Sequence, residues 1–202
     1  MVRIGIFMRR KIGTVCMIMG AALVLSALSL FLWNRWDDTL AGLQVEKVLP
    51  QLKELTEENE KDNGDPDSGD GEMKEIEIDG YAYIGYISIP SLGLELPVMS
   101  SWSYPQLKIA PCRYYGSVKT RDLVIAAHNY SRHFGNIKNL SAGDQVYFID
   151  VEGVISSYEV AEVDTLNPTD VENMTSSGYA LTLFTCTYGG QSRVTVRCNP
   201  GV

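Results

Sequence analysis

Hydrophobic residues follow three different patterns along this chain, and each pattern predicts a different kind of structure. Residues 12–33 form one uncharged and mostly apolar run, whereas residues 57–72 contain acids, glycines and other polar residues but no large apolar side chain. From residue 81 onward, short runs rich in β-branched and aromatic residues alternate with glycine, proline and asparagine, as strands and turns do. We therefore expect an apolar helix, a linker and a β-rich folded domain.

The apolar run predicts a helix that crosses a membrane once. At 1.5 Å per residue, a run of 22 residues reaches roughly 33 Å, enough for a hydrocarbon core of about 30 Å. Trp33 and Trp36 stand where aromatic side chains often lie at the membrane interface. A cleaved signal peptide is the alternative, but its apolar core spans about 7–15 residues and ends at a small-residue cleavage site. The pattern favours an uncleaved anchor over residues 12–33.

Charges beside this anchor predict its orientation. Residues 1–11 carry four basic residues and no acidic residue. Basic residues that flank a membrane helix stay on the cytoplasmic side. We therefore expect a cytoplasmic tail over residues 1–11, a single-pass anchor in the cell membrane, and an extracellular remainder.

Residues 34–79 are expected to connect the anchor to the folded domain. A juxtamembrane helix is predicted over residues 37–55, where apolar residues recur at a rough helical spacing. Residues 57–72 are predicted to be a disordered tether, because they have no apolar surface to bury. An active-site lid is disfavoured there, because acids and glycines surround Asp65 and Pro66. The apolar positions of the predicted helix are Leu40, Leu43, Val45, Val48, Leu52 and Leu55.

The net charge of −8 comes mostly from this connection. Residues 37–79 hold fifteen acidic and four basic residues, whereas residues 80–202 hold ten acidic and eight basic residues. The acidity therefore says nothing about a substrate, and the lack of a basic patch argues against nucleic-acid binding.

The pattern over residues 80–202 predicts one mainly β domain. Many short strands separated by turns favour a closed or nearly closed barrel, with functional residues at the strand ends. Short helical pieces are expected at residues 102–110 and 133–140. The strand candidates are residues 83–89, 94–98, 112–115, 122–127, 145–150, 154–166, 180–186 and 193–198.

Candidate chemistry lies at the ends of three of these strands. Cys186 ends an apolar run and Arg193 begins the next one after a glycine-containing turn, so a hairpin would bring them together. A nearby guanidinium favours a thiolate and can stabilise a developing oxyanion. His128 follows the apolar run 123–127 and could supply the base that a nucleophilic thiol needs. His133 is interpreted as structural or peripheral to the site.

The other cysteines have different expected roles. Cys16 lies in the anchor and should only pack. Cys198 lies about five residues along its strand from the turn, roughly 16 Å, which is too far for a disulfide with Cys186. A disulfide between Cys112 and Cys198 stays an open alternative in an extracellular protein. Because paired Cys-x-x-Cys spacing is absent, we expect no zinc site.

The sequence Thr-Leu-Phe-Thr-Cys at residues 182–186 resembles the Thr-Leu-x-Thr-Cys signature of the sortase family. Arg193 at the start of the next strand and His128-Asn129 after a Val-Ile-Ala-Ala run add to the resemblance, which covers roughly residues 81–198. The resemblance implies the eight-stranded sortase β-barrel with short helices, preceded here by a transmembrane helix.

The resemblance also implies an activity, cysteine transpeptidation. Such an enzyme cleaves a Leu-Pro-x-Thr-Gly-like sorting signal of a surface protein, holds the product as a thioester, and transfers it to an amine of a peptidoglycan precursor or a pilin. It implies Cys186 as the nucleophile, His128 as the acid and base, and Arg193 as the residue that stabilises the oxyanion and positions the substrate. Thr185 and Asn129 are candidate substrate-binding residues. No cofactor is expected; stimulation by calcium stays an open alternative that the sequence does not predict.

Some alternatives stay open. The connection between Cys186 and Arg193 is short for the family, so Arg197 on the same strand face is a second candidate for the arginine. An L,D-transpeptidase-like enzyme would carry a Ser-His-Gly-Cys-type motif, whereas this chain has Phe-Thr-Cys. A non-catalytic, membrane-anchored binding module is disfavoured because cysteine, histidine and arginine are all retained.

Overall fold

The computed structural model describes residues 2–62 and 72–201. The chain divides into two compact units, Met1–Asp38 and Thr39–Val202. The first unit is the N-terminal part of helix α1 (Val2–Asp62), and its side chains over residues 13–36 are exposed. By length and composition, α1 is long and apolar enough to cross a membrane. It is therefore a candidate membrane anchor, as the sequence predicts.

The second unit begins inside the same helix, because one face of α1 packs on the folded domain. Ala41, Val45, Val48, Leu52 and Thr56 are buried at intervals of three and four residues, which is the spacing of one helix face. The other predicted apolar positions, Leu40, Leu43 and Leu55, are exposed. The expected connecting helix is thus part of the folded unit instead of a spacer beside it.

Polar contacts fasten this part of α1 at several points. Three of its side chains form ion pairs of 2.7 Å with the rest of the unit, and Asn59 donates a hydrogen bond of 3.1 Å to the Val151 carbonyl. The expectation of disorder is wrong for residues 57–62, which continue the helix; residues 63–71 of the expected tether lie outside the described residues. The ion pairs are Glu46–Arg132, Lys47–Asp79 and Lys53–Glu95.

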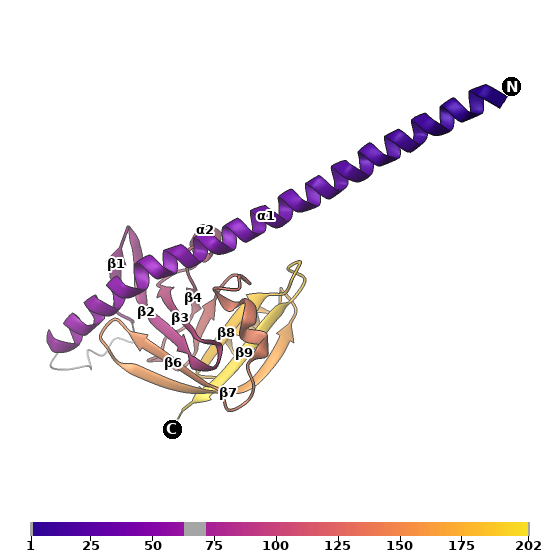
Figure 1. Cartoon of the computed structure of the whole chain (residues 1–202). Coiled ribbons are helices and arrows are strands. Elements are labelled where there is room, and N and C mark those ends of the chain that lie inside the picture. The colour runs from indigo at the N-terminus through magenta and orange to yellow at the C-terminus, as the bar shows by residue number, and fades with distance from the viewer. Residues whose placement is uncertain (1, 63–71, 202) are drawn as a thin grey trace. The chain divides into compact units, whose positions relative to one another are not determined.

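Eight strands close the barrel, and all eight correspond to runs predicted from the sequence (Figure 1). The order is β2-β3-β4-β5-β8-β9-β7-β6, and β6 pairs again with β2. A short additional strand, β1 (Ile76–Ile78), pairs with β2 and was not expected. The strands are β2 (Tyr81–Ile89), β3 (Leu94–Met99), β4 (Cys112–Tyr115), β5 (Leu123–Ala126), β6 (Gln145–Asp150), β7 (Ile155–Leu166), β8 (Leu181–Cys186) and β9 (Arg193–Pro200).

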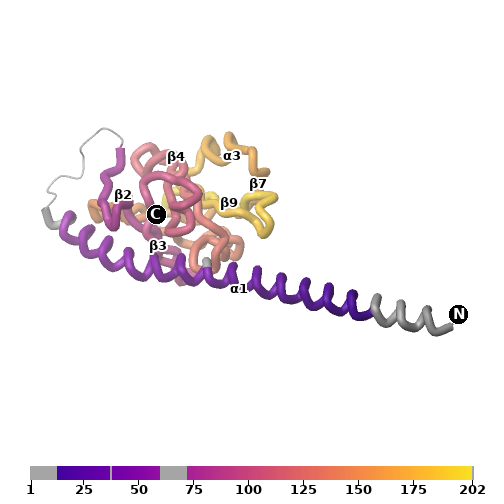
Figure 2. The backbone as a smooth tube through the Cα atoms, turned by 90° about the horizontal axis from the view of Figure 1, so that it is seen from above, coloured from indigo at the N-terminus to yellow at the C-terminus, as the bar shows by residue number. Residues whose placement is uncertain are grey.

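Short helices connect the strands. The two predicted pieces are α2 (Tyr104–Leu107), which Ser103 caps, and the 3-10 helix η2 (Phe134–Asn139). A 3-10 turn, η1 (Pro90–Leu92), and the helix α3 (Val171–Thr175) were not predicted. Asp170 accepts a hydrogen bond from the Asn173 amide and so caps α3. Figure 2 shows α3 beside β7 and β9.

Alternating apolar residues of the strands fill the barrel. The main cluster combines residues of β2, β5, β6, β8 and β9 with η2, so the core is continuous around the closed sheet. Its largest fully buried side chains include Ile84, Ile87, Phe134, Phe148 and Ile125. A second cluster places Val48 and Leu52 of α1 against barrel residues such as Tyr83, Met99 and Val151.

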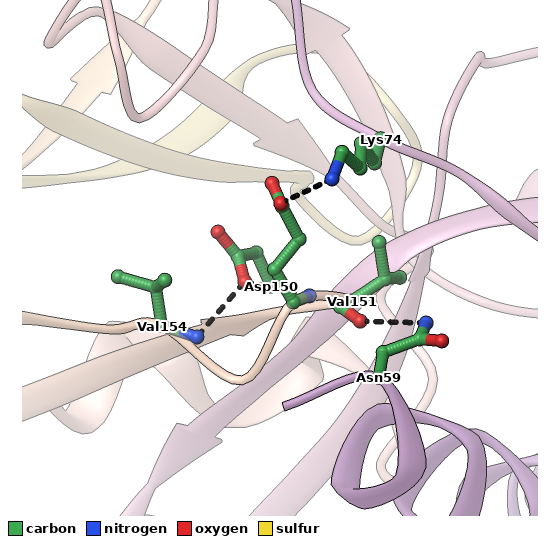
Figure 3. A network of polar contacts seen from close by, with 6 residues as sticks. Asn59, Lys74, Asp150, Val151 and Val154 are labelled. Carbon is green, nitrogen blue, oxygen red and sulfur yellow. Dashed lines mark hydrogen bonds and ion pairs between the residues drawn. The ribbon is translucent and has the colours of Figure 1, made fainter. Parts of the chain in front are cut away.

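The turn between β6 and β7 holds a network of polar contacts (Figure 3). Asp150 accepts hydrogen bonds from the amides of Glu152 and Val154 at 2.9 and 3.0 Å. Its partial burial raises the pKa of the Asp150 carboxyl. Lys74 pairs with the buried Glu152 at 2.6 Å. This turn therefore joins the C-terminal end of α1 and the segment before β1 to the barrel, at the end of β7 that lies away from Arg193.

Candidate active site

A cavity of about 210 Å³ lies where β5, β8 and β9 meet α2 and α3. Aromatic and apolar side chains form most of its walls, and the thiol of Cys186, the imidazole of His128 and the guanidinium of Arg193 also line it. The remaining lining residues are Trp102, Tyr104, Leu107, Tyr114, Ala126, Ala127, Asn167, Pro168, Asp170, Val171, Met174 and Phe184.

Cys186 ends β8 and is half-buried. It pairs in register with Arg193, the first residue of β9, as the hairpin in the sequence predicts. The connecting loop is closed by a bond of 3.0 Å from the Thr187 amide to the Ser192 carbonyl. Gly189 and Gly190 have φ values of 85° and 73°, which favour glycine and allow so short a turn.

Arg193 is held at this turn by main-chain carbonyls. Its Nη1 atom donates to the carbonyls of Gly190 and Ser192, both at 3.1 Å. A guanidinium carries five N–H donors in a fixed fork, and both of these bonds use one nitrogen. The local turn thus orients the charged group in the wall that also contains Cys186.

His128 reaches the same cavity through the parallel pairing of β5 with β8. The pairs run from Leu123–Leu181 to Ala126–Phe184, and the Ala127 amide continues the ladder to the Phe184 carbonyl at 3.1 Å. Continuing the same register places His128 alongside Cys186. Cys186 is therefore flanked by the strand that leads to histidine and by the strand that begins with arginine.

The imidazole of His128 has an aromatic neighbour. Its ring centroid lies 4.9 Å from that of Tyr130, and Tyr130 lies 5.5 Å from His133. His133 is fully buried and does not line the cavity.

Thr185 and Asn129 lie differently from the three central residues. Thr185 is buried, and its hydroxyl donates to the Ala127 carbonyl at 2.8 Å. It therefore ties β8 to the residue before His128 instead of facing the cavity. Asn129 is exposed and is not part of the cavity wall. A substrate contact by either residue stays a prediction.

Two walls of the cavity were missed in the sequence. Trp102, Tyr114 and Phe184 form an aromatic series with ring centroids 5.3 and 5.2 Å apart, and Tyr104 packs on Trp102 at 5.9 Å. The second of these walls is formed by Val171 and Met174 of α3 and by its capping residue Asp170. These aromatic residues belong to separate segments of the sequence. The only sequence signal for them is that they are aromatic, and this signal does not show that they lie together.

The alternative arginine, Arg197, does not line the cavity. It is buried, and its Nη1 donates to the Asn173 carbonyl at 3.0 Å. The geometry therefore favours Arg193 as the arginine beside the thiol.

The other thiols lie apart from this site. All four cysteines are free, so Cys112 and Cys198 do not form the disulfide that the sequence left open. Burial raises the pKa of both thiols to about 12, which keeps them protonated at neutral pH. Within the part of the chain that the structure describes, no group of three or more His, Cys, Asp or Glu could hold a metal ion.

The protein is a closed β-barrel in which a thiol, an imidazole and a guanidinium lie at three strand ends. These features place it in the class of barrel proteins whose chemistry depends on a cysteine. The profile described as Sortase domain matches residues 87–201, and the chain belongs to the sortase family.

Individual proteins resemble the chain in sequence or in fold. Sortase A of Bacillus anthracis is 32% identical over 121 residues, which cover 57% of each protein, so the chain spans less than two thirds of that relative. Sortase A from Corynebacterium diphtheriae has a TM-score of 0.55 at 23% identity, covering 60% of this chain and 62% of that one. Sortase C from Clostridium perfringens, solved with the C-terminal cell wall sorting motif, has a TM-score of 0.52 at 20% identity, covering 78% and 89%.

Proposed function

We propose that this chain is a membrane-anchored cysteine transpeptidase that acts on a Leu-Pro-x-Thr-Gly-like sorting signal. The observation that carries the proposal is the presence of Cys186, His128 and Arg193 in one cavity with apolar walls. The amine acceptor is proposed to come from a peptidoglycan precursor or a pilin. Family membership and the relative solved with a cell wall sorting motif support this class of substrate.

The first half-reaction forms a thioester. The Cys186 sulfur attacks the carbonyl carbon of the scissile Thr–Gly bond, and Arg193 stabilises the oxyanion of the tetrahedral intermediate. When the C–N bond breaks, protonated His128 gives its proton to the leaving amine. The acyl group stays on sulfur.

The second half-reaction transfers the acyl group. The acceptor amine attacks the thioester carbonyl while neutral His128 takes its proton, a C–N bond forms, and the C–S bond breaks. The thiolate and the protonated imidazole are restored. His128 carries the proton in both half-reactions. We therefore propose that the reaction requires no cofactor and no calcium ion.

The direct test uses the full chain in detergent with sorting-signal peptides and several amine acceptors. We expect a peptidyl adduct on Cys186 by mass spectrometry, and no cleavage or transfer by Cys186→Ala. Cys198→Ala is the matched control, because its thiol is buried away from the cavity. An adduct on another cysteine, or turnover by Cys186→Ala, would contradict the proposal. Turnover that disappears with a chelator would contradict its cofactor-free form.

A further inference from the structure

Arg197 is a buried cation whose position the mechanism above does not use. Only 6% of the residue is exposed, although it lies on β9 only four residues from the cavity-lining Arg193. A buried charge is costly unless other groups pair with it and accept its hydrogen bonds. The partners of Arg197 therefore indicate what its burial achieves.

This guanidinium has three contacts, which reach three different segments, although its Nε atom is buried without a hydrogen-bond partner within the described residues. Nη1 donates to the Asn173 carbonyl at 3.0 Å, and Nε lies 3.2 Å from the Glu162 carboxylate. Its central carbon lies 5.5 Å from the ring centroid of Tyr179. Glu162 belongs to β7, Asn173 to α3, and Tyr179 to the segment that leads into β8. Arg197 thus connects the barrel wall to the β7–β8 connection.

α3 needs such external contacts to hold its place. It has five residues, and helices this short are not stable by themselves. Met174 is buried against Val124 and Leu166, which fixes one side of α3. The bond from Arg197 to the carbonyl of the preceding residue, Asn173, fixes the backbone beside it.

The same helix forms part of the cavity. Val171 and Met174 line it, together with the capping residue Asp170. A shift of α3 would therefore change the wall that meets a bound peptide, whereas it would leave Cys186 and Arg193 on their paired strands.

We propose that Arg197 is a positioning residue that holds α3 as a wall of the cavity and thereby sets the affinity for the sorting-signal peptide. The substrate named here rests on the proposed function. Arg197 contacts no reacting atom; it acts through Asn173 and α3. The two arginines of β9 then have different effects: Arg193 determines the rate of the chemical steps, and Arg197 determines the affinity for the peptide.

The test compares steady-state kinetics of full-chain variants in detergent. Arg197→Met keeps the apolar stem but removes all three polar contacts, so we expect KM to rise about tenfold and kcat to stay within about twofold. Arg197→Lys keeps the charge near Glu162 but loses the fork, so its KM should lie between those of Arg197→Met and the parent. Glu162→Gln, at an exposed carboxylate, should raise KM only about two- to threefold. Arg193→Lys should instead lower kcat about 10²–10³-fold.

A matched control separates positioning from general loss of stability. Lys74→Met removes the partner of the buried Glu152, more than ten residues along β7 from the cavity, and should destabilise the fold without changing KM. A KM rise in Arg197→Met no larger than that in Lys74→Met would overturn the inference.

Hydrogen exchange gives a readout that does not need activity. Arg197→Met should speed amide exchange selectively over residues 167–179, whereas Lys74→Met should not. Unchanged exchange over that segment would also overturn the inference. If the parent turns over no sorting-signal peptide, the proposed function fails, while the exchange result still decides whether Arg197 holds α3.

Discussion

Single residues at this site are distinguished by their surroundings more than by their chemical type. Cys186 is half-buried at the edge of a cavity, whereas Cys112 and Cys198 are fully buried in apolar clusters. Burial raises the pKa of these two thiols to about 12 and also blocks access to them.

Thiol modification should therefore discriminate among the barrel cysteines. In the native protein at pH 7–8, iodoacetamide should alkylate Cys186 and leave Cys112 and Cys198 unmodified, as peptide mass spectrometry can determine. Denaturant should make all of them reactive. Alkylation of Cys112 or Cys198 at a rate similar to that of Cys186 in the native state would contradict the described burial.

Two buried threonines offer a second comparison at this scale. The Thr185 hydroxyl bonds to the Ala127 carbonyl at 2.8 Å, whereas the buried Thr195 hydroxyl has no hydrogen-bond partner within the described residues. Thr185→Val should lower the free energy of unfolding by about 1–2 kcal/mol and reduce kcat, because the carbonyl before His128 loses its partner. Thr195→Val should be neutral or stabilising. Equal losses in urea unfolding of the two variants would refute this difference.

Among the elements, α1 has two parts that differ in the exposure of their side chains. Residues 13–36 are an exposed, mostly apolar part of this helix, whereas residues 41–56 bury one face in the folded unit. Three ion pairs accompany that packing, but exposed pairs of this kind each contribute at most about 1 kcal/mol. The buried aliphatic side chains therefore provide most of the docking free energy.

Two leucines of α1 test this view. Leu52 is fully buried and Leu55, less than one turn later, is 36% exposed. In a protein that begins at Thr39, Leu52→Ala should lower the free energy of unfolding by about 2–4 kcal/mol. Leu55→Ala should change it by less than about 0.5 kcal/mol. Similar effects in denaturant titrations would show that the helix does not dock by this face.

The elements also show how far sequence patterns reach. The eight barrel strands and the hairpin from Cys186 to Arg193 follow from alternating apolar residues and a glycine turn, which are local signals. Local sequence signals do not show which face of α1 packs on the folded unit. Six apolar positions had a rough helical spacing, but only Val45, Val48 and Leu52 are buried, because the partner surface decides which face is used.

The site was predictable to a similar extent. Cys186, His128 and Arg193 stand at strand ends that local patterns identify. The aromatic series of Trp102, Tyr114 and Phe184 joins three separate segments, and α3 depends on Arg197 from another strand. Such walls are products of tertiary packing, which no local periodicity records.

For the whole molecule, the basic N-terminal residues and the apolar helix together predict a cytoplasmic N-terminus and an extracellular catalytic unit. In a Cys186→Ala background, an introduced cysteine at Ser68 should react with a membrane-impermeant maleimide on intact cells. A cysteine at Met8 should react only after permeabilisation. The reverse labelling pattern would show the opposite orientation.

The docking of α1 also determines what a proteolytic nick would do. If the chain were cut between residues 63 and 71, the covalent link between the anchor and the barrel would be lost. The anchor piece would still end in a helix that buries Val48 and Leu52 against barrel residues and hydrogen-bonds through Asn59 to Val151. The two fragments would then remain associated by complementation, and the barrel would stay attached to the N-terminal helix after the backbone was broken.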